Sequence, residues 1–224
     1  TQSRSSAASD VYKRQALAYE PGTELPKPYP RPSLQIDPQS RDAALAKFGL
    51  SLDRPVLALC PGAEFGEAKR WPSEHYAQVA EAKIREGWQV WLFGSKNDHA
   101  VGEEIRGRLI PGLREESSNL SGETSLAEAI DLLSCADSVV SNDSGLMHVA
   151  AALNRPLVAV YGSTSPGFTP PLADRVEVVR LGIECSPCFD RTCRFGHYNC
   201  LRQLLPQPVN EALQRLQGTV VEVQ

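Results

Sequence analysis

The feature that most constrains the fold is a regular alternation of short apolar runs with amphipathic segments. Apolar runs without polar alternation are typical of strands buried on both faces, and helices between them make parallel connections. The sequence therefore predicts an α/β fold, a parallel sheet with helices on both faces. Strands are expected at Val56–Cys60, Trp88–Phe93, Ser118–Leu120, Ser138–Ser141, Leu157–Tyr161 and Val176–Leu181. Helices are expected over 42–48, 73–86, 98–109, 125–135, 145–153 and 209–217.

Composition excludes several classes of protein. The 224 residues suffice for one large or two small domains. A net charge of −4 argues against general nucleic-acid binding. The chain has no run of about 18 or more apolar residues that would predict a membrane-spanning helix, and the first residues lack the apolar segment of a secretory signal. Six cysteines beside a large apolar core predict reduced thiols and a cytoplasmic location.

Three parts of the chain are distinguished by their patterns. Residues 1–15 show no periodicity, so we expect them to be disordered and foreign to the domain. Residues 16–50 resemble a linker, because six prolines lie between positions 20 and 38. A short helix is expected to end this part at Gly49. Residues 51–224 carry the alternating pattern, and the single methionine, Met147, suggests a piece of a longer protein.

The strongest indication of chemistry is the polar turn Asp143-Ser144-Gly145, which follows the fourth expected strand and opens a helix. The first N–H groups of a helix have no partner within it and carry partial positive charge. Gly145 has no side chain that would keep a ligand away from these groups. Asp143 or Ser144 could cap the helix and also offer oxygen atoms to sugar hydroxyls. The turn therefore predicts a phosphate site, with an ordinary capped helix start as the alternative.

Two further loops, 61–72 and 162–171, also follow strand ends, where parallel sheets bind their ligands, so we expect the three loops to cluster. Lys69 suits a phosphate oxygen, and a solvated surface lysine is the alternative. His148 is expected near the helix N-terminus, although an exposed or capping histidine would fit the same pattern. The hydroxyls of the 162–171 loop could join the site, or the loop could be a plain turn. The buried face opposite His148 is expected to consist of Leu146, Val149, Ala150 and Leu153. In the helix expected over 125–135, one face is expected to consist of Leu126, Ala129, Ile130 and Leu133.

These segments resemble the ADP-heptose:lipopolysaccharide heptosyltransferases of glycosyltransferase family 9. The resemblance runs from about residue 16 to the end and depends on the strings at 61–72, 142–156 and 165–171. It implies one half of a GT-B glycosyltransferase, an inverting enzyme whose two Rossmann-like domains face each other across a cleft. Residues 51–224 would then be the C-terminal domain, which binds the nucleotide-sugar donor.

The resemblance also implies the reaction, the transfer of L-glycero-D-manno-heptose from ADP-heptose to the inner core of lipopolysaccharide. No cofactor or metal is implied beyond this donor substrate. In this family, the general base and the acceptor site belong to an N-terminal domain, and no matching segment is found in this sequence. No catalytic residue is therefore expected in this chain. The chain alone is expected to bind the donor weakly and to transfer no heptose. The whole enzyme would contact the inner membrane peripherally. The implied donor contacts are Lys69 and His148 with the diphosphate, Thr124 near adenine, Asp143 with heptose hydroxyls, and the backbone N–H groups of Gly145 and Leu146 with phosphate. Ser144 is expected to be a further substrate-binding residue.

Three alternatives differ in chemistry. A nucleotide-sugar epimerase or a non-catalytic nucleotide-sugar-binding module would share the fold. An NAD-dependent dehydrogenase is disfavoured, because Pro61-Gly62-Ala63 stands where that class needs Gly-x-Gly-x-x-Gly.

A cysteine-rich segment near the C-terminus has one Cys-x-x-Cys pair. Four thiolates can close a tetrahedral zinc site, but zinc ribbons usually use two such pairs, so a loop of reduced thiols is favoured and metal binding stays open. Cys60 and Cys135 are expected in the core. The segment contains Cys185, Cys188, Cys193 and Cys200, with His197 between them.

Overall fold

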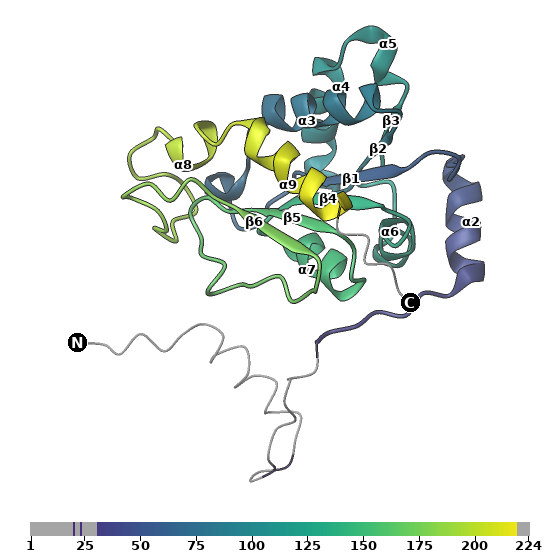
Figure 1. Cartoon of the computed structure of the whole chain (residues 1–224), viewed down its shortest axis with the longest axis horizontal. Helices are drawn as coiled ribbons and strands as arrows, with labels where there is room; N and C mark the ends of the chain where they lie inside the picture. The colour runs from purple at the N-terminus through teal and green to yellow at the C-terminus, as the bar shows by residue number, and fades with distance from the viewer. Residues whose placement is uncertain (1–19, 21–22, 24–30, 219–224) are drawn as a thin grey trace.

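The computed structural model describes residues 20, 23 and 31–218; the prediction for residues 1–15 lies outside them. Six parallel strands form one sheet in the order β3-β2-β1-β4-β5-β6 (Figure 1), as the predicted fold class requires. The central strands β1, β4 and β5 are buried along their whole length, which explains their lack of polar alternation. The strands are β1 Val56–Cys60, β2 Gln89–Leu92, β3 Ser117–Asn119, β4 Ser138–Asn142, β5 Leu157–Val160 and β6 Val176–Val179.

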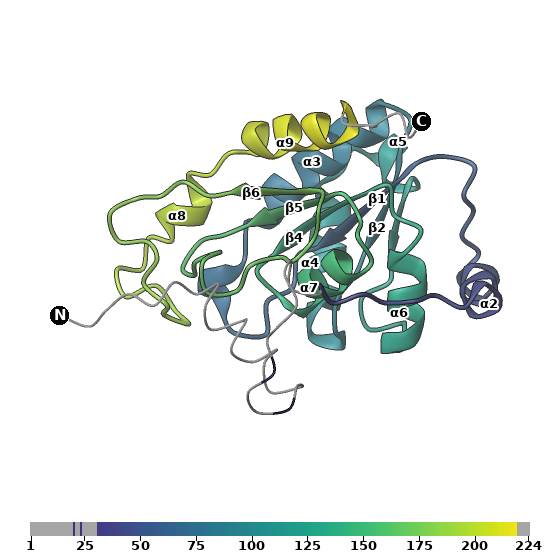
Figure 2. The same ribbon diagram turned by 60° about the horizontal axis from the view of Figure 1, so that its bottom comes forward.

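Helices cover both faces of the sheet and divide the core in two (Figures 1 and 2). Side chains alternate between the faces of a strand, so Leu57 and Leu59 pack with one helical layer, and Ala58 packs with the other. Within the described residues, no helix has the length and apolar content needed to cross a membrane. The first layer holds α3 Ser73–Arg85, α4 His99–Arg108 and α9 Pro206–Gly218, and the second holds α2 Pro38–Phe48, α6 Leu126–Leu133 and α7 Gly145–Ala152.

Short helical elements were not predicted, because four residues or fewer do not complete a periodic pattern. They lie in the connections between the longer elements. They are η1 Glu67–Lys69, η2 Lys96–Asp98, α5 Pro111–Arg114 and α8 Asn199–Arg202.

Helix α2 begins four residues earlier than predicted. The carboxylate of Asp37 accepts a hydrogen bond of 3.1 Å from the N–H of Gln39, and Pro38 occupies the first helical position. Both features favour a helix start, so the last proline of the proline-rich segment begins the helix instead of preventing it. The helix ends as predicted at Gly49, whose φ of 62° is left-handed.

The predicted buried faces of two helices are partly wrong. Leu126 of α6 is 68% exposed, whereas Leu132 is fully buried. In α7, Leu146 and Val149 are only half-buried, and the buried face is built around Met147 and Ala150. Because α7 is apolar around most of its circumference, its sequence does not select one face, and contact with the sheet makes the selection.

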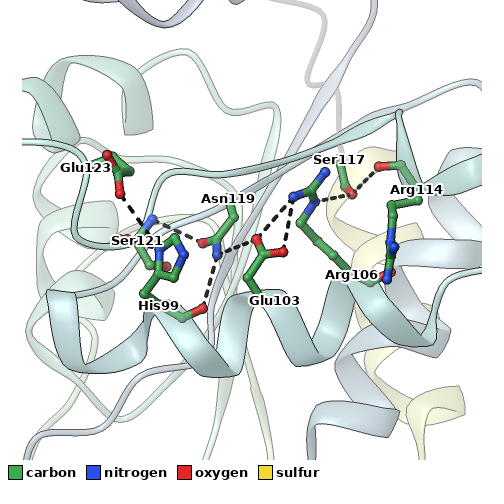
Figure 3. A network of polar contacts seen from close by, with 8 residues as sticks. All are labelled: His99, Glu103, Arg106, Arg114, Ser117, Asn119, Ser121 and Glu123. Carbon is green, nitrogen blue, oxygen red and sulfur yellow. Dashed lines mark hydrogen bonds and ion pairs between the residues drawn. The ribbon is translucent and has the colours of Figure 1, made fainter.

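The weakly predicted strand β3 is held by a polar network with α4 (Figure 3). The side-chain amide of Asn119 donates to the carbonyl of His99 at 3.1 Å and to the carboxylate of Glu103 at 2.9 Å. Arg106 donates to the hydroxyl of Ser117 at 3.2 Å. These contacts explain how a strand with the polar sequence Ser-Ser-Asn is stabilised at the edge of the sheet.

Candidate functional site

The candidate site lies where the strand order of the sheet reverses. The chain passes from β1 to β2 and β3 on one side, and then returns to β4, β5 and β6 on the other. In open α/β sheets, ligands bind outside the carboxyl ends of the strands at this reversal. Lys69, in the loop after β1, and Asp143, directly after β4, meet at this point with Nζ and Oδ2 2.7 Å apart. The predicted clustering of these two loops is therefore confirmed.

The third predicted loop joins the same group. The hydroxyl of Thr164 donates a hydrogen bond of 2.6 Å to Oδ2 of Asp143. The Asp143 side chain is 3% exposed and that of Lys69 is 12% exposed. A buried charge is costly unless it is paired and hydrogen-bonded, and this carboxylate has both a cation and a hydroxyl donor. Of the two interpretations of this loop, the structure thus supports the one in which a hydroxyl, that of Thr164, joins the group around Asp143.

Asn142 fixes the loop after β1 against the end of β4, and sequence reasoning missed it. Its side chain is fully buried. Its Oδ1 accepts hydrogen bonds from the backbone N–H of Trp71 at 3.2 Å and from the hydroxyl of Tyr76 at 3.0 Å. Its Nδ2 donates to the carbonyl of Pro61 at 2.6 Å. The available signal was a polar residue at the end of an apolar strand, directly before Asp143.

The N-terminus of α7 has no side-chain cap, so the predicted capping by Asp143 or Ser144 is wrong. The Asp143 carboxylate is held instead by the lysine and threonine described above. The hydroxyl of Ser144 lies 3.3 Å from that of Ser141. Gly145 is exposed, and a Cβ atom built on it would have no other atom within 4 Å. The start of α7 is therefore open beside Gly145, and its first N–H groups have no side-chain cap that would compete with an anion.

His148 points away from the buried face of α7, as predicted, and is exposed. Although solvent reaches the side chain, partial desolvation by the surrounding protein lowers the pKa of its imidazole. The negative charge of Asp143 raises this pKa, and the positive charge of Lys69 lowers it further. Lowering the pKa favours the neutral ring at pH 7, which can both donate and accept hydrogen bonds. Burial raises the pKa of nearby Tyr161, and the charge of Asp143 adds to this increase, so these side chains share one electrostatic environment.

Thr124 lies apart from this group. It belongs to the connection between β3 and α6, and its hydroxyl donates to the carbonyl of Leu120 at 3.4 Å. Strand β2 separates β3 from β1 in the sheet. The structure therefore brings together Lys69, Asp143 and the start of α7, whereas only an extended ligand could also reach Thr124.

Two cavities are lined by residues of the loop after β1 and of the cysteine-rich segment. A cavity of about 540 Å³ is lined by Arg70, Trp71 and Tyr198, and one of about 590 Å³ by residues around Phe195. Neither is lined by Lys69, Asp143 or His148.

The cysteine-rich segment gathers its thiols behind the Lys69 loop. Within the described part of the chain, no three histidine, cysteine or acidic side chains are placed to hold a metal ion together, and the cysteines are free. Backbone N–H groups, first that of Tyr198, lower the pKa of the Cys193 thiol. Of the two predicted core cysteines, Cys60 is buried but Cys135 only half-buried. One small cavity is lined by Cys185, Cys188, Cys193, Cys200 and His197 together with Ala68 and Ser163.

This segment braces the loops of the candidate site through its backbone. The N–H of Ala68 donates to the carbonyl of Arg191 at 3.1 Å. The N–H of Phe189 donates to the carbonyl of Ser163 at 2.7 Å. The ring of Phe65 has Lys69 Nζ 4.8 Å from its centroid and Arg191 Cζ 5.2 Å from it. The segment thus supports the position of both Lys69 and the 162–171 loop.

Comparison with known proteins connects this geometry to one family. A family model described as glycosyltransferase family 9 (heptosyltransferase) matches residues 4–199. Lipopolysaccharide heptosyltransferase 2 of Escherichia coli strain K12 is 46% identical over 206 residues, which are 90% of this chain and 59% of that protein. The chain therefore spans only about three-fifths of the length of this relative.

Solved structures give the same result. The structure of E. coli ADP-heptose LPS heptosyltransferase II is 46% identical, with a TM-score of 0.79 over 90% of this chain and 59% of that chain. E. coli heptosyltransferase WaaC with ADP is 25% identical, with a TM-score of 0.57 over 84% of this chain and 52% of that chain. The predicted Rossmann-like half of a GT-B glycosyltransferase is confirmed by these similarities.

Proposed function

Because the chain belongs to glycosyltransferase family 9, the heptosyltransferases, we propose that residues 51–224 bind ADP-heptose for heptose transfer to the inner core of lipopolysaccharide. One observation carries this proposal. The buried Lys69–Asp143 pair lies beside the uncapped N-terminus of α7, at the reversal point of the sheet. This arrangement offers a cation and free N–H groups to a diphosphate, and a carboxylate to a sugar.

The proposed chemistry needs charge stabilisation on the leaving group. The acceptor hydroxyl would attack the anomeric carbon of the heptose with inversion, while the bond to the diphosphate breaks and its oxygen gains negative charge. Lys69 and the N–H groups of Gly145 and Leu146 would stabilise that charge, because they are oriented before the reaction begins. The helix dipole itself contributes only about 0.3–2 kcal/mol, and Lys69 would add a full positive charge. This scheme uses no metal ion or other cofactor.

The remaining contacts follow from the length of the donor. With its diphosphate at α7, the nucleotide would extend along the carboxyl edge of the sheet towards Thr124, which is proposed to lie near adenine. His148, one turn into α7, would add a hydrogen bond to the phosphates. Ser144 would contact the donor at the entrance to the helix.

The acceptor site and the general base are proposed to belong to the part of the relatives that this chain does not span. The lipopolysaccharide inner core would be bound there, and peripheral contact with the inner membrane would occur through that part, on its cytoplasmic side. A positioned base accelerates a reaction by about 10²–10⁴-fold, and positioning of the reactants accounts for up to roughly 7–11 kcal/mol of the barrier. The 224-residue chain alone is therefore expected to bind the donor weakly and to transfer no heptose.

Calorimetric titration of the chain with ADP-heptose, ADP, UDP and GDP tests this proposal. We expect the two adenine ligands to bind more tightly than UDP or GDP, because the site would recognise both base and diphosphate. A preference for UDP or GDP would overturn the assignment of the donor. Incubation with ADP-heptose, followed by product analysis, should reveal neither epimerised sugar nor transfer to an inner-core acceptor. An epimerised product would favour the epimerase alternative, although the relatives that the chain matches are heptosyltransferases.

A further inference from the structure

We propose that Thr164 is a positioning residue, which holds the Asp143 carboxylate in place for sugar hydroxyls while Lys69 turns to the diphosphate. This inference rests on the proposed function and assigns different roles to Thr164 and Lys69, the two side chains that bond to Asp143. It concerns a residue that no motif singled out individually.

The first step is the geometry of the carboxylate. Oδ2 of Asp143 accepts from Lys69 Nζ at 2.7 Å and from Thr164 Oγ1 at 2.6 Å. The Thr164 residue is 7% exposed, so its hydroxyl bond is shielded from water. Among the residues that the structure describes, both side-chain donors to this carboxylate are bonded to Oδ2. Oδ1 is therefore the oxygen left to accept hydrogen bonds from a ligand.

The second step is the competition for Lys69. A lysine ammonium is a mobile point charge with three donors on a flexible stem. A diphosphate at the start of α7 carries more negative charge than a single carboxylate, and it draws the ammonium towards itself. The threonine hydroxyl is neutral and is not drawn in this way. Thr164 therefore keeps Asp143 hydrogen-bonded when Lys69 is shared, which a buried carboxylate requires.

The third step is the rigidity of the loop that carries Thr164. On one side, the hydroxyl of Ser186 donates to the carbonyl of Gly162 at 2.6 Å, and the N–H of Ser163 donates to the carbonyl of Ala68 at 3.3 Å. On the other side, the hydroxyl of Tyr161 donates to the carbonyl of Thr169 at 2.5 Å. A side chain on a loop fixed at both ends can hold a neighbour in a defined orientation.

The test uses Thr164→Val, which removes the hydroxyl and keeps the branched shape. Thr169→Val is the matched control, because its Oγ1 lies in the same loop, is buried and has no hydrogen-bond partner. Thr164→Ser restores the hydroxyl. Calorimetry with ADP-heptose and with ADP separates the two halves of the donor, and urea denaturation checks that each variant folds.

We expect Thr164→Val to weaken ADP-heptose binding about tenfold, as for a lost hydrogen bond to a charged group, and to change ADP binding less than twofold. Thr164→Ser should bind ADP-heptose with nearly the affinity of the unaltered chain. Thr169→Val should have the affinity of the unaltered chain for both ADP-heptose and ADP. An equal loss for ADP and ADP-heptose, or no loss for either, would overturn the positioning role.

Failure of the proposed function has a different signature, since the unaltered chain would then bind neither ligand. A crystal structure of Thr164→Val with ADP bound gives a readout that does not depend on an affinity, because the diphosphate is then present to draw Lys69 away from Asp143. With ADP bound, we expect the Asp143 carboxylate of the variant to have turned away from residue 164, and an orientation equal to that of the unaltered chain with ADP would contradict the proposal.

Discussion

Two strands of this sheet end in asparagine, and the two side chains make the same number of hydrogen bonds in different surroundings. Asn119 ends β3 at the edge of the sheet and is half-buried. Its amide donates to His99 and Glu103, and its Oδ1 accepts from the N–H of Ser121 at 3.2 Å (Figure 3). Asn142 ends β4 at the centre of the sheet and is fully buried.

The difference lies in what each network leaves for a ligand. In the edge network the polar groups bond to one another, since Arg106 donates to the carboxylate of Glu103 and to the hydroxyl of Ser117. The central network holds two loops in place and leaves the N–H groups of α7 open beside a charged pair. Similar polar residues thus stabilise a strand at the edge, whereas at the reversal point they build a surface that can bind an anion.

The largest expected effect is the loss of stability on Asn142→Ala. This change leaves the Pro61 carbonyl, the Trp71 N–H and the Tyr76 hydroxyl without their partner in a buried place. Unsatisfied buried groups cost about 1–3 kcal/mol each, and allowing for relaxation we expect a loss of about 4 kcal/mol in the free energy of unfolding. Asn119→Ala is the matched variant, for which water can replace the partners and about 1 kcal/mol is expected. Urea denaturation measures both, and equal losses would break the comparison.

The next effect is that of Lys69→Met, which leaves Asp143 buried without a cation. Breaking a buried ion pair costs about 3–5 kcal/mol, and we expect about 3 kcal/mol because the Thr164 hydroxyl remains. ADP affinity should fall at least tenfold in calorimetry. Lys47→Met is the control, because its pair with Glu128 is exposed, and exposed pairs contribute about 0.2–1 kcal/mol. If Lys69→Met lowered the free energy of unfolding no more than Lys47→Met does, the buried pair would contribute no more to stability than the exposed pair.

The smallest effect is that of Glu103→Gln at the edge, and it depends on pH. Hydrogen bonds from Asn119 first, and then from Arg106, lower the pKa of the Glu103 carboxyl in the folded chain. A lowered pKa stabilises the fold above the ordinary value of about 4.5, and the contribution disappears as pH falls through the lowered value. Because this carboxylate is about half exposed, solvent screening limits the contribution to about 0.5 kcal/mol.

Urea denaturation of the unaltered chain and the Glu103→Gln variant at pH 7 and pH 3 measures this effect. The difference in stability should be present at pH 7 and smaller at pH 3. A difference that grew as the pH fell would contradict a lowered pKa for Glu103 in the folded chain.

Much of the fold was predictable because it depends on local patterns. Strand β1 was predicted with its observed bounds. All five of its residues are apolar, so both faces of the strand must be buried and the apolar run itself marks where the strand begins and ends. The observed bounds of β2 and β3 differ from the predicted ones by one residue at each end, because pairing with the neighbouring strands decides where a strand begins and ends. The positions of Lys69, Asp143 and Gly145 after strand ends followed from the same pattern. By contrast, Leu126 was assigned to the core from periodicity alone, although it lies in the first turn of α6 and faces solvent.

The sequence by itself determined the α/β class, the order of strands and helices along the chain, and the loops that carry polar groups. Only the tertiary structure decided that β1 and β4 are neighbours, that Lys69 and Thr164 share one oxygen of Asp143, and that α7 is left uncapped. The physical reason is distance along the chain. Lys69 and Asp143 are separated by 74 residues, and no local preference specifies which strand ends meet. That choice is made by the burial of both faces of the sheet, which brings distant polar groups together.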